Sequence, residues 1–126
     1  MKEYMLLIRN KMNHQADWTS EHHLQFLKSC EKYIGKLKAE NRIISAQPLV
    51  REGVIISGTS DNLTEMTLNE TEEVQVGYYH IYANDISEAT TIARDNPEFA
   101  FSNSAIIEVR PVKTKENTTG FVYPKQ

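Results

Sequence analysis

The sequence predicts an α+β fold of the ferredoxin-like kind, a plait in which one antiparallel sheet carries two helices on one face. The chain has 126 residues, which is enough for a single domain with a substantial core. Strand-like and helix-like segments alternate in the order β-α-β-β-β-α-β, and both helices need a sheet face to cover. We expect residues 1–112 to form the domain and residues 113–126 a C-terminal tail.

The first strand and helix have the clearest signals. Residues 3–9, EYMLLIR, are an apolar run that predicts a central strand. A helix over residues 20–40 is indicated by Thr19 or Ser20 as N-cap and by Asn41 as a left-handed C-cap. Apolar side chains recur along it at helical spacing, namely Leu27, Cys30, Ile34 and Leu37, with Phe26 and Tyr33 widening the stripe.

The middle of the chain is less regular. Residues 42–50 and 54–58 read as β segments interrupted by Pro48 and Gly53, forming either a hairpin or a bent edge strand. Residues 59–73 are polar, with a possible β segment around residues 66–68. A clear strand resumes at residues 74–83.

The second helix and last strand complete the pattern. Asp85 followed by Glu88 is a capping box, and an apolar face continues from Ile86 until Pro97 ends the helix. Residues 104–112, SAIIEVRPV, predict the final strand.

Alternation along residues 76–83 predicts which side chains face the helices, because neighbouring residues of a strand point to opposite faces. The smaller, more apolar set suits the helix side: Gly77, Tyr79, Ile81 and Ala83. The other set faces away: Val76, Tyr78, His80 and Tyr82. An exposed aromatic face is unfavourable in a monomer, so we expect a homodimer through the open sheet face, a barrel-like α/β assembly with a cavity between the sheets.

Composition excludes several classes of protein. The net charge is −3 and the lysines of the first helix alternate with glutamates, which argues against direct nucleic-acid binding. The uninterrupted apolar run from Met5 to Ile8 is too short for a membrane span or signal peptide, so we expect a cytoplasmic protein without membrane association. The single Cys30 permits no intrachain disulfide and is expected to be buried and inert. Glycine-rich phosphate loops and nucleophile elbows are absent, and we expect no cofactor.

His80 is the first candidate catalytic residue. Its strand places it between Tyr78 and Tyr82, where an imidazole titrating near neutrality and two phenols could bind a polar ligand. The alternative is an interface histidine that is hydrogen-bonded to the partner chain.

His22 and His23 are further catalytic candidates. They lie in the first turn of the first helix, where the helix dipole disfavours protonation and keeps an imidazole available as a base. One of them is expected to pack against the core. Adjacent helical residues cannot bind one ion together, although His14 could join one of them, so we predict no metal site.

Four charged residues are candidate ligand-binding groups. Arg9 and Arg110 could meet on the sheet face and hold a carboxylate, or pair structurally with nearby glutamates. Glu70 and Glu73 could act as acid and base, or remain solvated in a polar loop.

The chain resembles the YCII-related proteins, within them the branch named for a DGPF motif. The matching pieces are KEYMLLI, LKAENRIISAQPL, ETEEVQVGYYHIYANDISEA and SAIIEVRPV. At the position of the DGPF motif this chain has Glu65, Met66, Thr67 and Leu68. The resemblance implies a ferredoxin-like fold, dimerisation through sheet faces, a histidine and acid pair whose histidine would be His22 or His23, and a link in some relatives to sigma factors.

The first functional hypothesis is a homodimer that binds an unidentified small polar or aromatic molecule, with histidine-based acid/base chemistry. A second is a non-catalytic regulatory or interaction module, linked to sigma-factor regulation, whose tail contacts a partner through Phe121, Val122 and Tyr123. A third is a cofactor-free monooxygenase with an apolar pocket lined by Tyr78, Tyr82, Phe99 and Phe101.

Overall fold

The computed structural model describes residues 1–68 and 72–124. The described chain is α+β, as predicted, and its main sheet has the strand order β2-β5-β1-β6 with every neighbouring pair antiparallel. A separate two-stranded sheet joins β3 to β4. The elements are β1 (Lys2–Lys11), α1 (Ser20–Ala39), β2 (Ile43–Pro48), β3 (Val54–Thr59), β4 (Asn62–Thr67), β5 (Glu73–Ala83), α2 (Ile86–Arg94), α3 (Glu98–Phe101) and β6 (Ile106–Pro111).

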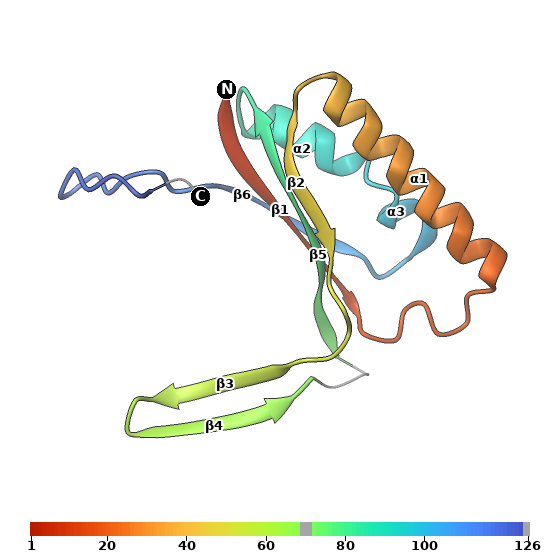
Figure 1. The fold of residues 1–126 in the computed structure, drawn as a ribbon, viewed down its shortest axis with the longest axis horizontal. Coiled ribbons are helices and arrows are strands. Elements are labelled where there is room, and N and C mark those ends of the chain that lie inside the picture. The colour runs from red at the N-terminus through yellow and green to blue at the C-terminus, as the bar shows by residue number, and fades with distance from the viewer. Residues whose placement is uncertain (69–71, 125–126) are drawn as a thin grey trace.

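The core lies between one face of the main sheet and the helices, which all lie on that side (Figure 1). Strand β1 is central, and its alternate residues Tyr4, Leu6, Ile8 and Asn10 are buried, as period two requires. The intervening residues of β1 face the other side of the sheet, which no helix covers in the described chain.

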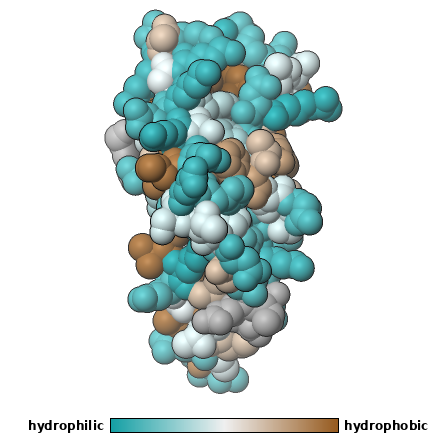
Figure 2. Space-filling view, turned by 90° about the vertical axis from the view of Figure 1, so that its right-hand side faces the viewer, coloured by the Kyte–Doolittle hydropathy of each residue, from teal (hydrophilic) through white to brown (hydrophobic). Residues whose placement is uncertain are grey.

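Helix α1 begins and ends where its sequence predicts. The Thr19 side chain accepts a hydrogen bond from the His22 backbone N–H at 3.1 Å, and Asn41 has the predicted left-handed conformation with φ of 57°. The helix buries Phe26 and Leu37. Leu27, predicted as a member of the buried stripe, is instead 48% exposed, because it borders an open cavity between the helix and the sheet. From the side on which the helices lie, the surface is mostly hydrophilic, with apolar side chains in small separate groups (Figure 2).

A β-bulge in β5 overturns one face assignment. The pairing of β1 with β5 shifts between Ile8 and Arg9, which face Gly77 and Gln75 respectively, so Val76 is the extra residue. Val76 was predicted on the open face, but it is buried in the core on the helix side. Alternation alone cannot anticipate this, because a single inserted residue moves every side chain before it to the opposite face.

The structure matches neither alternative for the middle of the chain, because the two β segments lie in different sheets. Strand β2 is an edge strand of the main sheet, paired with β5. The second β segment pairs with β4, which begins at Asn62, earlier than the segment predicted around residues 66–68. The turn between them needs Gly58, because its φ is +116° and a Cβ there would lie 2.1 Å from the Asn62 carbonyl oxygen.

The N-cap of α2 at Asp85 is confirmed, while the Glu88 side chain reaches back to Asn84 and not to the Asp85 N–H. The Glu88 backbone N–H donates to Asp85 at 2.8 Å, and the Glu88 carboxylate accepts from the backbone N–H of Asn84 at 3.3 Å. The helix ends at Arg94, and a second short helix, α3, follows Pro97. Within the described ranges, no helix is both long and apolar enough to cross a membrane.

Candidate functional site

A cavity of about 320 Å³ lies between α1 and the β2–β5 side of the sheet. Helix α1 contributes an apolar wall with Phe26, Leu27 and Ile34, and the sheet contributes the opposite wall. The volume is at the lower end of the range for small-molecule sites in proteins. Polar side chains line part of it: Gln15, His23, Gln47, Arg51, Asn96 and Glu98.

Glu98 is the most unusual group in this lining. Its backbone N–H donates to the side-chain oxygen of Asn96 at 2.9 Å, which holds the first turn of α3 in place. Its side chain is only 9% exposed, and Oε2 is buried without a hydrogen-bond partner. Burial raises the pKa of Glu98, an effect that the positive charge of Arg51 and a contact with Asn10 partly oppose.

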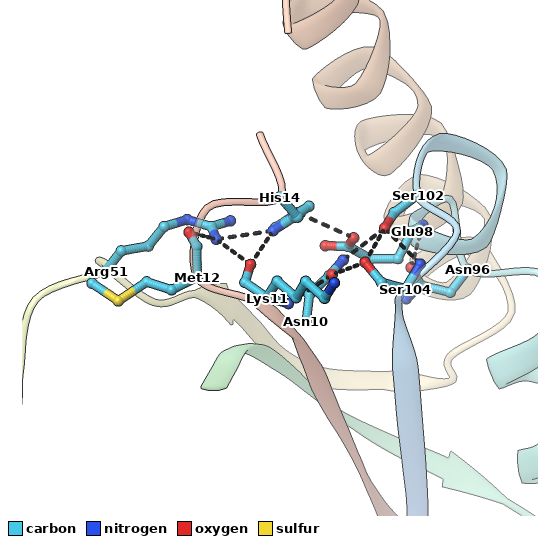
Figure 3. A network of polar contacts seen from close by, with 9 residues as sticks. All are labelled: Asn10, Lys11, Met12, His14, Arg51, Asn96, Glu98, Ser102 and Ser104. Carbon is cyan, nitrogen blue, oxygen red and sulfur yellow. Dashed lines mark hydrogen bonds and ion pairs between the residues drawn. The ribbon is translucent and has the colours of Figure 1, made fainter. Parts of the chain in front are cut away.

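The side chain of His14 faces Glu98 across a short gap. Its ring is 2% exposed, and Nε2 lies 3.8 Å from Glu98 Oε2 (Figure 3). Nδ1 lies 2.9 Å from the Lys11 carbonyl oxygen and 2.9 Å from Nη1 of Arg51. Burial lowers the pKa of His14, the hydrogen bond to Lys11 opposes this, and the Arg51 charge lowers the pKa further.

The two contacts of His14 Nδ1 require different tautomers. A proton on Nδ1 is donated to the Lys11 carbonyl and leaves Nε2 as an acceptor facing Glu98. If Nδ1 instead accepts from Arg51, the proton is on Nε2 and points toward the Glu98 carboxylate. Burial shifts both pKa values toward the uncharged forms, upward for Glu98 and downward for His14.

The polypeptide around this pair is anchored by side-chain hydrogen bonds. Asn10, fully buried at the end of β1, donates to the Ser102 hydroxyl at 3.0 Å and accepts from Ser104 at 2.7 Å. Arg51 donates to the Met12 carbonyl at 2.7 Å. These bonds join the loop after β1 to the segment around α3 and to the residues after β2, so they hold His14 and Glu98 in position.

The structure places the two predicted helical histidines differently. His23 lines the cavity together with Arg51 and Glu98. The His22 ring packs at 4.7 Å from the Trp18 ring and 5.2 Å from Phe101, centroid to centroid. One histidine therefore packs, as expected, and the other is available to the cavity.

The remaining predicted residues lie on the open sheet face. His80 Nε2 lies 2.9 Å from the Glu3 carboxylate. Arg9 pairs with Glu73 at 3.3 Å and approaches Glu108 at 4.0 Å, while Arg110 lies 3.5 Å from Glu108. The two arginines therefore share Glu108 of the same chain. This is the structural pairing that was the alternative to carboxylate binding by the two arginines.

The tyrosines and the other aromatic candidates lie on opposite sides of the sheet. Tyr78 and Tyr82 follow the open face of β5, although Tyr78 also contributes to the rim of the cavity. Phe101 packs against Trp18 and Phe26 on the helix side. The candidate Glu70 is outside the described residues.

Sequence reasoning missed the central pair. Glu98 stands in the apolar run PEFAF directly after a proline, and an isolated acid in such a run is the one signal that indicates burial. His14 and Arg51 lie in segments that read as polar loops. Their proximity depends on how three loops meet at one end of the sheet.

The thiol of Cys30 also lines the cavity, which gives a direct test of its environment. Burial raises its pKa to about 11, with the negative charge of Glu98 adding to the effect and a Tyr79 hydroxyl opposing it. We expect Cys30 to react with a disulfide reagent at pH 7.5 at least ~100-fold more slowly than free cysteine, since the thiolate is the nucleophile. Between pH 7 and 9 the rate should rise about tenfold per unit; a plateau near pH 8.5 would contradict a raised pKa.

Within the residues that the structure describes, no three histidine, cysteine, aspartate or glutamate side chains are grouped so that they could hold a metal ion. Comparison with known proteins finds no family model and no curated protein that matches the chain. Functional assignment therefore depends on the geometry of the cavity and its buried acid and base.

Proposed function

We propose that this protein binds a small molecule in the cavity between α1 and the sheet, that Glu98 exchanges a proton with it, and that His14 acts behind Glu98 as the proton partner of the carboxyl group. The single observation that carries the proposal is a buried carboxyl group at the cavity wall with a buried imidazole 3.8 Å behind it, where the facing atoms Glu98 Oε2 and His14 Nε2 make no hydrogen bond. Buried unpaired groups are unfavourable for stability, so their presence at a cavity indicates a functional role.

The shifts in pKa suit acid/base chemistry. A carboxyl whose pKa is raised by burial can give or accept a proton closer to neutral pH than an ordinary glutamate. His14, whose pKa burial lowers, can take up that proton from Glu98 or return it. His23 on the α1 wall is positioned to orient the ligand.

The lining defines the chemical class of ligand. Most of the wall is apolar, with Phe26 and Ile34 on one side and Val76 and Tyr79 on the other. The polar end has a carboxyl group at Glu98 and a guanidinium at Arg51. We infer a compact, partly aromatic molecule with one polar group that carries an exchangeable proton.

We further propose a YCII-related family membership, a ferredoxin-like plait and a homodimer through the open sheet face. The strand order β2-β5-β1-β6, with α1 and α2 on one face, supports the plait. The open face supports the dimer, because Met5, Leu7, Tyr78 and Tyr82 lie there beside charges of both signs. Ligand binding in this proposal belongs to each chain separately, since the cavity lies on the helix side.

A methyl NMR fragment screen tests the ligand site. With isoleucine and leucine methyls labelled, fragments that bind should shift Ile8, Leu27 and Ile34 at the cavity and leave Ile55 and Leu63 of the β3–β4 hairpin unchanged. The variant Ala46→Phe, which fills the cavity from β2, should remove these shifts. Hits that persist in this variant, or that cluster away from the cavity, would refute the site.

The regulatory alternative has one observation in its favour. The tail folds into a small loop closed by a bridge between Lys115 and Val122, and it exposes Phe121, Val122 and Tyr123. Such a segment could contact a protein partner, including a component of sigma-factor regulation. Removal of the tail should abolish partner binding in that case and leave the fragment shifts in place.

A further inference from the structure

We propose that the β3–β4 hairpin is an arm that docks on a second copy of this chain. The inference extends the dimer of the proposed function and depends on it, whereas the ligand cavity does not. The arm follows β2 at one corner of the main sheet and precedes β5 in the chain.

The hairpin carries more exposed apolar surface than a free ribbon would be expected to have. Cross-strand pairing places Val54, Ile56 and Leu63 on one face and Ile55 with Met66 on the other. These five side chains are between 49% and 65% exposed. Exposed apolar side chains grouped on one face, as Val54, Ile56 and Leu63 are, are typical of an interaction site.

The rest of the described chain offers this hairpin no cover. Every residue of β3 and β4 is exposed, and the two strands are paired only with each other. An isolated two-stranded hairpin is marginally stable in water and usually needs a packing partner. A surface outside the chain is therefore required to stabilise it.

The position of the hairpin indicates what that partner is. Figure 1 shows the hairpin and the C-terminal tail standing out on the side of the sheet opposite the helices. The two segments leave from diagonally opposite corners of the sheet. This is because β2 and β6 are opposite edge strands that run antiparallel to each other, so their C-terminal ends lie at opposite ends of the sheet. The space between them is bounded by the open sheet face, the same surface that is proposed to meet a second sheet.

A second copy fits this space better than an unrelated partner. The open face carries both signs of charge, with Arg9 and Arg110 beside Glu73 and Glu108, so it can be complementary to itself across a two-fold axis. The hairpin is continuous with the rim of that face. In a two-fold symmetric dimer, each chain docks its own arm on the other chain. The apolar area of both arms therefore adds to that of the stacked sheets and brings the interface closer to the ~800 Å² per partner of a standard interface.

A double substitution removes the apolar surface and keeps the hairpin. Ile56→Lys places a lysine directly opposite Glu65, a favourable cross-strand pair, and Leu63→Thr keeps a residue that favours strands. The matched control is Leu24→Lys, which changes a similarly exposed leucine on α1, away from the open face. Sedimentation equilibrium of the full chain gives the dimer dissociation constant for each protein.

We expect the double variant to raise the dissociation constant at least tenfold and the Leu24 variant to leave it within twofold. Hydrogen exchange provides a second measurement that does not depend on any variant. Hairpin amides of the wild-type chain should exchange at least tenfold more slowly at concentrations where it is dimeric than after dilution to monomer.

Two results would contradict the proposal that the hairpin docks on a second copy. A dimer with an unchanged dissociation constant in the double variant, and hairpin amides that exchange equally fast at both concentrations, would leave a sheet-face dimer without an arm. A wild-type chain that is monomeric at all concentrations would refute the dimer and the arm together. The fragment screen reports on the cavity within one chain, so neither result affects the ligand proposal.

Discussion

Replacement of Leu6 by alanine is expected to lower the free energy of unfolding by about 3–5 kcal/mol, the largest effect of any substitution considered for this chain. Leu6 is fully buried at the centre of β1, which is itself flanked by β5 and β6. Truncation removes buried methyl groups and leaves a cavity, because the surrounding strands are held by their ladders and cannot close in.

Urea unfolding of the wild type and variant provides the measurement. The variant should show a lower midpoint with an unchanged slope. A matched control is Leu24→Ala, since Leu24 is 51% exposed on α1 and should change the unfolding free energy by less than ~1 kcal/mol. Equal losses for the two variants would mean that β1 is not the centre of the core.

Replacement of Glu98 by glutamine is expected to stabilise the protein at alkaline pH by about 1–3 kcal/mol, because the variant avoids burying an ionised carboxylate. Glutamine keeps the shape of the side chain and cannot ionise. Burial raises the pKa of Glu98 above its ordinary value of 4.5, so the folded state holds this proton more tightly than the unfolded chain. The stability from this group is therefore complete below pH 4.5, declines as the pH rises through the raised pKa, and is constant above it.

His14 contributes the opposite slope. Burial lowers its pKa below 6.5, so its contribution to stability is complete above that pH and is lost as the pH falls through the lowered pKa. The Glu98→Gln variant should flatten the decline that begins above pH 4.5, and His14→Gln should flatten the decline that begins below pH 6.5. Urea unfolding from pH 4 to pH 9 measures both slopes.

Glu31→Gln is the control, because Glu31 is exposed on α1. It should shift stability by no more than ~0.5 kcal/mol at any pH. A Glu98→Gln variant that is less stable than the wild type at pH 8 would show that the carboxylate makes a net favourable ion pair with Arg51 or His14. The proposed role of Glu98 as a proton-holding acid would then be wrong.

Local signals in the sequence determined most of the elements. Thr19, Asn41 and Asp85 define helix ends through backbone hydrogen bonds within a few residues, so their effect does not depend on distant parts of the chain. The apolar run of residues 3–9 likewise predicted β1 as a central strand. The α+β class follows from the order of these elements.

Tertiary structure alone decided the rest. The bulge that turns Val76 inward depends on the pairing of β5 with β1, and the separation of β3 and β4 from the main sheet depends on the edge position of β2. Glu98 and His14 are 84 residues apart in the chain and meet only because the loops after β1 and α2 reach the same end of the sheet. Periodicity and capping report contacts within one element; a site made from several loops leaves no such pattern, because its residues share only a position in space.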